Sequence, residues 1–232
     1  ENTGASQHYR TLFPESGSST MTELIFVRHG ITDWNREKRL QGHTDIALNQ
    51  EGREQAARVA RALERENFDV FYSSDLSRAL VTAQAVASRH AQPVLARPEL
   101  RERHYGVFEG VPQHELPQRF PQAYTDWKAR NPQAALPGGE SLSDFYQRIS
   151  TYVQLLAQQH PGQRLFIATH GGVLDCIYRL CTATPLSAPR AWELPNTGIN
   201  RVRHEGNEFK LMVWADTQHL LDLNVQLETE HL

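Results

Sequence analysis

Blocks of apolar residues alternate along the chain with mixed polar stretches, and the shortest blocks are apolar almost throughout. Such runs are typical of strands buried on both faces of a parallel sheet. They cover residues 24–28, 70–73 and 165–169. Towards the end of the chain, stretches around 198–203 and 209–214 flank the turn-forming sequence HEGNE and predict a β-hairpin.

The longer blocks repeat apolar residues every three or four positions, which is the period of an amphipathic helix. They predict helices that begin near Asn49, Asp75, Ser141 and Gly171. We interpret Asp75 as a helix cap rather than as a catalytic acid, because aspartate is a favoured capping residue. The alternation of strands and helices predicts the α/β class, in the form of a three-layer α/β/α sandwich with a mostly parallel central sheet.

Prolines divide the middle of the chain from these regular elements. Five of them lie between residues 111 and 137, which predicts a connection with short helices, and Pro93 and Pro98 also interrupt regular structure. We therefore expect one domain over residues 21–232, with a small cap around residues 103–140.

The first 20 residues are polar and rich in Gly, Ser and Thr. We interpret residues 1–20 as a disordered lead-in or a remnant of an expression vector, and Met21 as the native start.

Composition narrows the class of function without deciding it. The 232-residue chain has a net charge of −3, so we expect neither nucleic acid nor a membrane as partner. Cys176 and Cys181 are five positions apart on a predicted helix and cannot face each other, which favours free thiols and a cytoplasmic location. A monomer and a homodimer are equally compatible with the sequence.

The predicted strands end in polar, reactive residues, and ligands of α/β sheets bind beyond the carboxyl ends of the strands. The first strand ends in Arg28 and is followed by His29, the third is followed by His170, and Arg78 opens the helix after the second. If these strands are adjacent and parallel, two histidines and two arginines meet at one edge. Such a pocket favours a tetrahedral oxyanion, because arginine pairs bidentately with phosphate and two permanent positive charges oppose a metal cation.

Five segments, in this order, resemble the signature of the histidine phosphatase superfamily, which comprises cofactor-dependent phosphoglycerate mutases and related phosphatases. The segments are RHGITDWN (28–35), SSDLSRALVTA (73–83), ELRERHYGVFEG (99–110), PGGES (137–141) and THGG (169–172). Together they span nearly the whole chain. The resemblance implies a phosphoglycerate mutase-like fold and an enzyme that handles phosphate esters.

The resemblance also implies a role for each matching residue. His29 would attack phosphorus to give a phosphohistidine, which requires a neutral attacking nitrogen and a hydrogen bond that fixes the proton on the other nitrogen. Arg28, Arg78 and His170 would hold the phosphoryl oxygens and stabilise charge in the transition state. Glu102 would protonate the leaving oxygen and then help to activate water. No metal would take part.

Further positions are expected around the substrate. The resemblance makes Asn35 an added phosphate donor and places Gln41 at a position of further polar contact. Gly171, Tyr105 and Arg103 are the remaining candidates for substrate binding.

Two points stay open at this level. The charged sequence ELRER offers Glu99, and the residues after it offer Glu109, as rivals to Glu102 for the role of the acid. Lys128 and Arg130 in the cap, like Arg103, are candidate contacts for an acidic group of the substrate, and solvated surface charges explain them equally well.

The residues separate a phosphatase from a mutase only in part. The stretch ERHYG has the form found in mutases, but Gln113 stands where mutases carry a lysine for the substrate carboxylate. Only 37 residues lie between Glu102 and Glu140, without an Arg-Arg pair. A short, open cap admits water and favours hydrolysis. We therefore expect a metal-independent phosphatase of the phosphatase-type branch that acts on small phosphorylated metabolites. A phosphoglycerate mutase primed by 2,3-bisphosphoglycerate is the alternative, and a catalytically weak module that binds phosphorylated ligands is a minor one.

Overall fold

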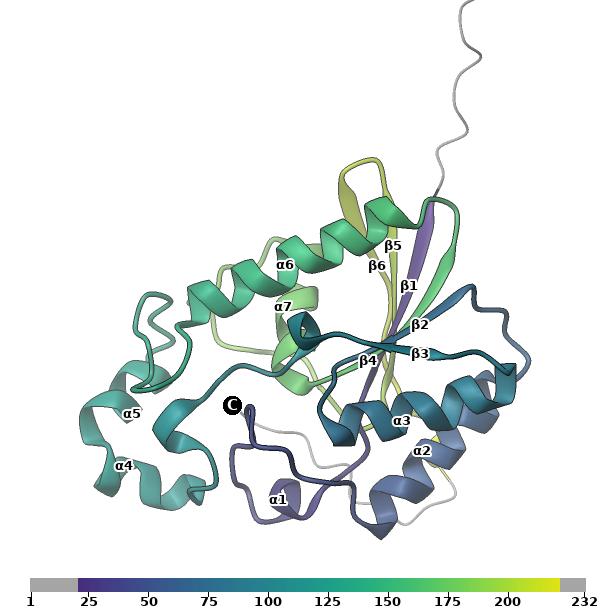
Figure 1. Cartoon of the computed structure of the whole chain (residues 1–232). Helices are drawn as coiled ribbons and strands as arrows, with labels where there is room; N and C mark the ends of the chain where they lie inside the picture. The colour runs from purple at the N-terminus through teal and green to yellow at the C-terminus, as the bar shows by residue number, and fades with distance from the viewer. Residues whose placement is uncertain (1–20, 222–232) are drawn as a thin grey trace, which may run out of the picture.

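A computed structural model describes residues 21–221, in which six strands form one sheet with helices on both faces (Figure 1). The strand order is β3-β2-β4-β1-β5-β6. The strands are β1 Thr22–Arg28, β2 Val70–Ser73, β3 Val94–Ala96, β4 Arg164–Thr169, β5 Ile199–Glu205 and β6 Glu208–Asp216. The predicted disordered lead-in, residues 1–20, lies outside the described residues.

Four strands are parallel, and the other two form the antiparallel hairpin predicted near the end of the chain. β1 pairs with β4, β4 with β2, and β2 with β3 in parallel, whereas β5 and β6 are antiparallel neighbours on the other side of β1. The mostly parallel sheet is therefore confirmed. Strand β3 was not predicted, because Pro93 and Pro98 frame only a few residues. At a sheet edge such flanking prolines are tolerated, since they remove no hydrogen bond from the ladder.

Seven α-helices and five short 3₁₀ turns complete the described part of the chain. The helices are α1 Asp33–Arg36, α2 Gln50–Leu63, α3 Ser77–Ala87, α4 Leu116–Arg119, α5 Pro121–Lys128, α6 Leu142–Gln159 and α7 Gly171–Thr182. The 3₁₀ turns are Ser88–His90, Pro98–Leu100, Gly106–Phe108, Gln113–Glu115 and Gln218–Leu220.

The side chains at the helix starts confirm two of the expected caps and correct a third. The Asn49 side chain accepts a hydrogen bond from the Gly52 amide, and the Ser141 hydroxyl accepts one from the Asp144 amide. Asp75 is not the cap of α3: the N-cap position is Leu76, one residue later, and the Asp75 carboxylate pairs with Arg101 at 2.6 Å. A guanidinium in reach is a stronger partner than a backbone amide.

The two faces of the sheet bury separate apolar clusters, as the alternation of side chains along a strand requires. In β1, Leu24 and Phe26 pack in the cluster that includes the apolar faces of α6 and α7. Ile25 and Val27 pack in the cluster that includes those of α2 and α3. This layering holds the sheet rigidly between its helices, so the residues at its carboxyl edge have fixed positions.

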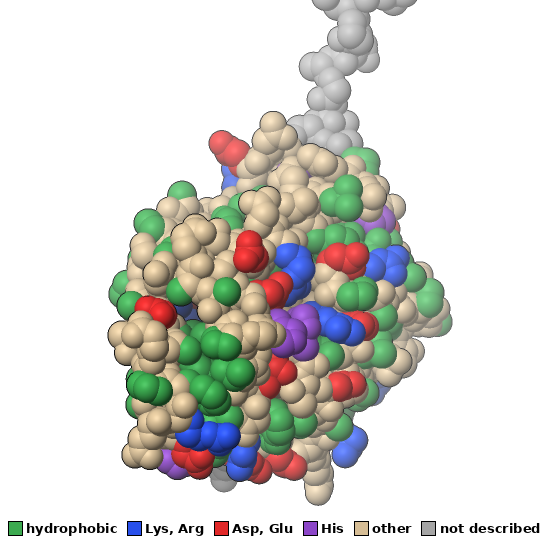
Figure 2. Space-filling model, turned by 60° about the vertical axis from the view of Figure 1, so that its left-hand side comes forward, with side chains coloured by type: hydrophobic (Ala, Val, Ile, Leu, Met, Phe, Trp, Pro, Cys, Tyr) green, Lys and Arg blue, Asp and Glu red, His purple; other side chains and the backbone are tan. Residues whose placement is uncertain are grey.

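The segment that carries α4 and α5 projects away from the sheet (Figure 1). It has its own apolar cluster, in which Phe108 and Leu116 are fully buried and Trp127 packs at the border. On the surface of this side, acidic and basic side chains are mixed (Figure 2). We call this segment, residues 103–140, the cap.

Two further findings concern the cysteines and the helices. Cys176 and Cys181 are free thiols, as expected from their spacing. Within residues 21–221, none of the helices combines the length and the apolar character that crossing a bilayer requires.

Candidate active site

The sheet topology brings the two strand-end histidines together. His29 follows β1 and His170 follows β4, and these strands are parallel neighbours in which Arg28 lies opposite Thr169. The ring centroids of His29 and His170 are 5.3 Å apart. The convergence expected from the sequence therefore follows directly from strand order and register.

His29 is held in one protonation state by its surroundings. Its Nδ1 lies 2.7 Å from the Gly30 carbonyl oxygen. A carbonyl only accepts, so Nδ1 carries the proton and Nε2 has a free lone pair. Burial, followed by the positive charges of Arg78 and Arg28, lowers the pKa of His29 well below its ordinary value. A neutral imidazole with one available nitrogen is the form that a nucleophile needs.

Arg28 and Arg78 are both about 1% exposed and are positioned by backbone carbonyls. Arg78 donates to the Thr44 and Gly42 carbonyls at 2.9 and 2.8 Å, and Arg28 donates to the Leu194 carbonyl. A carbonyl has no net charge, so these bonds orient the guanidinium groups without neutralising them. The two cations can therefore attract and hold an anion beside His29.

His170 lies behind His29 and is fully buried. Its Nε2 is 2.8 Å from the Ser74 hydroxyl, and its Nδ1 is buried without a hydrogen-bond partner among the described residues. Burial, Arg78 and His29 lower the pKa of His170 well below its ordinary value. The imidazole is neutral as the structure stands, and a bound phosphoryl group would offset the repulsion that opposes its protonation.

Glu102 is the acid that the structure places in the site. Its two carboxylate oxygens accept hydrogen bonds from the backbone amides of Arg103 and Gly172, at 2.7 and 2.9 Å. Gly172 leaves room for this arrangement, because a Cβ at this position would overlap the Glu102 carboxylate. The rival Glu99 is exposed, and the other rival, Glu109, bonds to amides of the neighbouring loops, including that of Tyr105 at 3.0 Å.

Except for His170, which is not among the lining residues, these groups line one small cavity at the carboxyl edge of the sheet. His29 and Glu102 share it with both arginines and with Tyr105. Among residues 21–221, its lining is Arg28, His29, Leu40, Gln41, Gly42, Arg78, Glu102 and Tyr105. We call it the catalytic cavity.

The remaining candidates lie at different distances from this cavity. Gln41 lines it, and Asn35 is buried nearby. The side-chain carbonyl oxygens of Asn35 and Gln41 lie 3.0 and 2.9 Å from the Thr32 hydroxyl. Asn35 is thus also the partner of a capping box at the start of α1. Gly171 is the buried first residue of α7 and is not among the lining residues.

Two residues that support the histidines were not predicted. Asn196 donates to the backbone carbonyl of His29 at 2.9 Å, and Ser74 holds His170. Ser74 stands at the end of β2, where strand ends were expected to carry chemistry. Asn196 comes from a loop with no pattern that could have indicated it.

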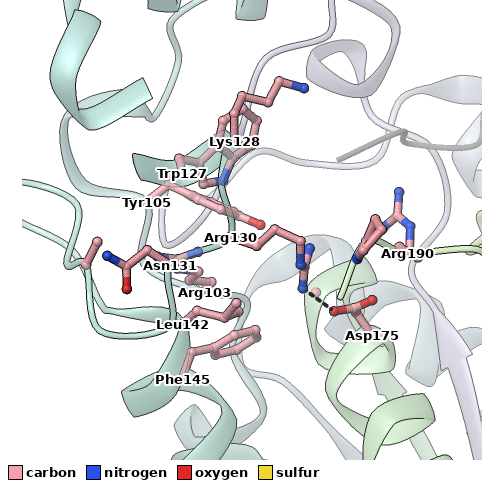
Figure 3. A pocket seen from close by; sticks show the side chains of 13 residues that line it. Arg103, Tyr105, Trp127, Lys128, Arg130, Asn131, Leu142, Phe145, Asp175 and Arg190 are labelled. Carbon is pink, nitrogen blue, oxygen red and sulfur yellow. Dashed lines mark hydrogen bonds and ion pairs between the residues drawn. The ribbon is translucent and has the colours of Figure 1, made fainter. Parts of the chain in front are cut away.

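A second, larger cavity of about 190 Å³ lies between the cap and α7 (Figure 3). Arg103, Lys128 and Arg130 all line it, and so do two residues that were not predicted, Asp175 and Arg190. The described residues that line it are Arg103, Tyr105, Trp127, Lys128, Arg130, Asn131, Ala134, Leu142, Phe145, Gly172, Asp175, Pro189 and Arg190. We call it the cap cavity.

The donor set of the catalytic cavity suits an oxyanion and does not suit a metal ion. Two guanidinium groups stand beside the one carboxylate, and they would repel a cation. Across residues 21–221, there is no group of three or more His, Cys, Asp or Glu side chains that could hold a metal ion. A nucleophile, an acid and anion-binding groups together permit phosphoryl transfer.

Comparison with known proteins gives a consistent result. The family model described as "Histidine phosphatase superfamily (branch 1)" matches residues 24–217. The phosphoglycerate mutase-like protein 4 of Arabidopsis thaliana is 40% identical over 85% of this chain and 86% of its own length. The metal-independent phosphoserine phosphatase of the same plant is 36% identical over 87% and 84%.

A solved structure shares both the fold and part of the sequence. The phosphoserine phosphatase of Entamoeba histolytica, in complex with 3-phosphoglyceric acid, aligns with a TM-score of 0.77. It is 28% identical, and the alignment covers 86% of this chain and all of the other.

Proposed function

Because the chain belongs to the histidine phosphatase superfamily, branch 1, we propose that it hydrolyses small phosphate esters, without a metal, through a phosphohistidine on His29. The observation that carries the proposal is the neutral His29 with a free Nε2, in a cavity that it shares with two arginines and Glu102. The phosphatase names of the relatives support the same reaction class.

In the first step, the lone pair on Nε2 of His29 attacks phosphorus. The bond from phosphorus to the ester oxygen breaks, and that oxygen takes a proton from Glu102 and leaves as an alcohol. Arg28 and Arg78, with His170 behind them, stabilise the charge on the transferring group. Removal of one such donor typically costs about 10²–10³ in turnover.

In the second step, the Glu102 carboxylate takes a proton from a water molecule, which attacks the phosphohistidine. The phosphorus–nitrogen bond breaks, inorganic phosphate leaves, and His29 returns to its neutral form. Because Glu102 alternates between acid and base, each turnover restores the starting state of the enzyme.

Hydrolysis is favoured over mutase activity by the cap. A mutase must keep water from the phosphoenzyme, whereas this cap is short and its cavity is open to solvent at Lys128, which is exposed. Gln113, at the position of the mutase lysine, is not among the residues that line either cavity.

The free, buried thiol of Cys176 supports a cytoplasmic location as part of the same proposal.

The experiment compares hydrolysis and isomerisation by the purified protein, with EDTA in every assay. The substrates are p-nitrophenyl phosphate and 3-phosphoglycerate, the latter with and without 2,3-bisphosphoglycerate. We expect phosphate release from both, unaffected by EDTA. Efficient isomerisation that depends on bisphosphoglycerate, with little phosphate release, would favour the mutase instead. Loss of activity in EDTA would overturn the metal-free mechanism.

A further inference from the structure

The cap cavity adjoins the place from which the leaving group departs. Tyr105 lines both cavities, so the two are neighbours. Gly172 lines the cap cavity, and its amide holds the Glu102 carboxylate that protonates the leaving oxygen. The alcohol part of a bound phosphate ester therefore extends into the cap cavity, and the chemistry of that cavity decides which alcohol is accepted.

Arg103 is a buried cation in this cavity that makes no direct ion pair with an acid. It is 6% exposed, and its Nε and Nη2 donate to the Glu140 carbonyl oxygen at 3.1 and 2.9 Å. It forms no ion pair with any carboxylate in the described part of the chain; the Glu140 carboxylate itself is held by Arg148 at 2.8 Å. An unbalanced buried charge is costly, and an anion that binds beside it removes that cost.

The bonds of Arg103 also limit the kind of anion that fits. Two of its donor nitrogens already serve the Glu140 carbonyl, which leaves the Nη1 side of the guanidinium for a ligand. One free edge and one unbalanced charge match a monoanionic carboxylate better than a second phosphate, which would need several donors. Lys128 and Arg190, on the same lining, would attract either kind of anion, so the choice between the two rests on Arg103.

Asp175, the single acid among the described residues of the lining, is already fully engaged. It accepts hydrogen bonds from Arg179 at 2.8 Å and from Arg130 at 3.3 Å, the latter contact shown in Figure 3. Two guanidinium groups therefore compensate its one charge. A substrate ammonium that enters this cavity meets cations and no carboxylate that is free to receive it.

Resting on the phosphatase activity proposed above, we infer that the cap cavity selects phosphate esters whose alcohol carries a carboxylate, with Arg103 as the residue that pairs with it. The same cavity gives no advantage to an ammonium group next to that carboxylate. The preferred substrates are phosphorylated hydroxy acids, and phosphorylated amino acids are accepted through their carboxylate alone.

Substrate pairs that differ in one group test this inference. 3-Phosphoglycerate and glycerol 3-phosphate differ by a carboxylate, and so do O-phosphoserine and O-phosphoethanolamine. We expect kcat/KM to be at least about 30-fold higher for the carboxylate member of each pair. We also expect kcat/KM for 3-phosphoglycerate to equal or exceed that for O-phosphoserine. A substrate with a second phosphate in place of the carboxylate should show a smaller increase in kcat/KM.

The variant Arg103→Met should reduce both carboxylate preferences at least about tenfold. The matched control is Arg119→Met, which removes an exposed cap arginine from a surface ion pair with Glu115 and should leave both ratios unchanged. Thermal melts check that each variant is folded. If Arg103→Met does not fold, inhibition of the wild type decides: glycerate should inhibit p-nitrophenyl phosphate hydrolysis, and glycerol should not.

The outcomes separate this inference from the proposed function. If p-nitrophenyl phosphate is hydrolysed but the wild type shows no carboxylate preference, the subsite is wrong and the phosphatase stands. Equal preference in Arg103→Met and the wild type would assign the selection to another residue. A strong preference for O-phosphoserine over 3-phosphoglycerate would show that Asp175 does receive an ammonium. If no ester is hydrolysed, the proposed function itself fails.

Discussion

The arginines beside the His29 imidazole serve two purposes at once. In the proposed mechanism Arg28 and Arg78 hold the anionic phosphoryl group, and the same charges make a protonated imidazole unfavourable. Burial acts in the same direction, while the hydrogen bond to the Gly30 carbonyl opposes it. The balance keeps the ring neutral, so the groups that bind the phosphate also keep the nucleophile active.

This balance predicts the pH dependence of the first step. The folded pKa of His29 lies below 6.5, so the attacking form is complete above that pH and is lost only as the pH falls through the lowered value. We expect the acid limb of kcat/KM, corrected for ionisation of the substrate, to lie below pH 6.5. Arg78→Gln removes one cause of the shift and should move the limb to higher pH. An unchanged acid limb in Arg78→Gln would contradict this explanation of the pKa. The control is His114→Ala, which changes an exposed histidine of the cap.

The position of Glu102 predicts a specific kinetic defect. Glu102→Gln cannot protonate a poor leaving group or deprotonate water, so turnover of an alkyl phosphate should fall by about 10²–10⁴. With p-nitrophenyl phosphate, whose leaving group needs no proton, the first step should survive and the second should not. Rapid-quench or stopped-flow measurement should then show a burst of p-nitrophenol followed by slow turnover. Equal loss on both substrates without a burst would place the acid elsewhere, with Glu109 tested next.

At the scale of elements, the helix starts show how local chemistry sets boundaries. Asn49→Ala removes the hydrogen bond to the Gly52 amide and should destabilise the protein by about 1 kcal/mol. Asp75→Ala removes only a partly exposed ion pair with Arg101 and should cost between about 0 and 1 kcal/mol. Denaturant unfolding of the two variants against the wild type measures both values. A larger loss for Asp75→Ala would mean that this carboxylate does stabilise the start of α3.

The elements differ in how well the sequence predicts them. Uniformly apolar runs between turn signals predicted β1, β2 and β4, and Ser141 marked the start of α6, because each signal is local. The short strand β3 has only three residues and its pairing with β2 is a tertiary contact, so no pattern within it could indicate it. Asp75 was misassigned for a similar reason: its partner Arg101 is 26 positions away.

The residues of the site also differ in how well the sequence predicts them. Residues in contiguous motifs, such as Arg28 with His29, were predicted together with their meeting at one edge, because strand ends in a parallel sheet share that edge. Asn196 and Arg190 lie in a loop after α7 that reaches the site only through the fold. The contact between Asp175 and Arg130, 45 positions apart, is likewise a property of the folded cap, whereas the Asp175–Arg179 pair has the i,i+4 spacing of a helix and is visible in the sequence.

At the scale of the whole molecule, the sheet and the cap have different functions in the proposed mechanism. The carboxyl edge of the sheet holds the reacting groups, fixed from behind by two packed layers of helices. The cap, with its separate apolar cluster, adjoins that edge and carries the cationic lining that we propose receives the rest of the substrate. Reaction type and substrate choice are therefore assigned to different parts of the chain, and substitutions in one should affect mainly one of the two.

The most direct test of the central claim is capture of the phosphoenzyme. The protein is mixed with a substrate labelled in its phosphoryl group, quenched in alkali, and the labelled peptide is sequenced. We predict base-stable, acid-labile label on His29 in the wild type and in the control His114→Ala, and neither label nor turnover in His29→Ala. Label that persists in His29→Ala would contradict the account and move the nucleophile elsewhere, with His170 as the first alternative.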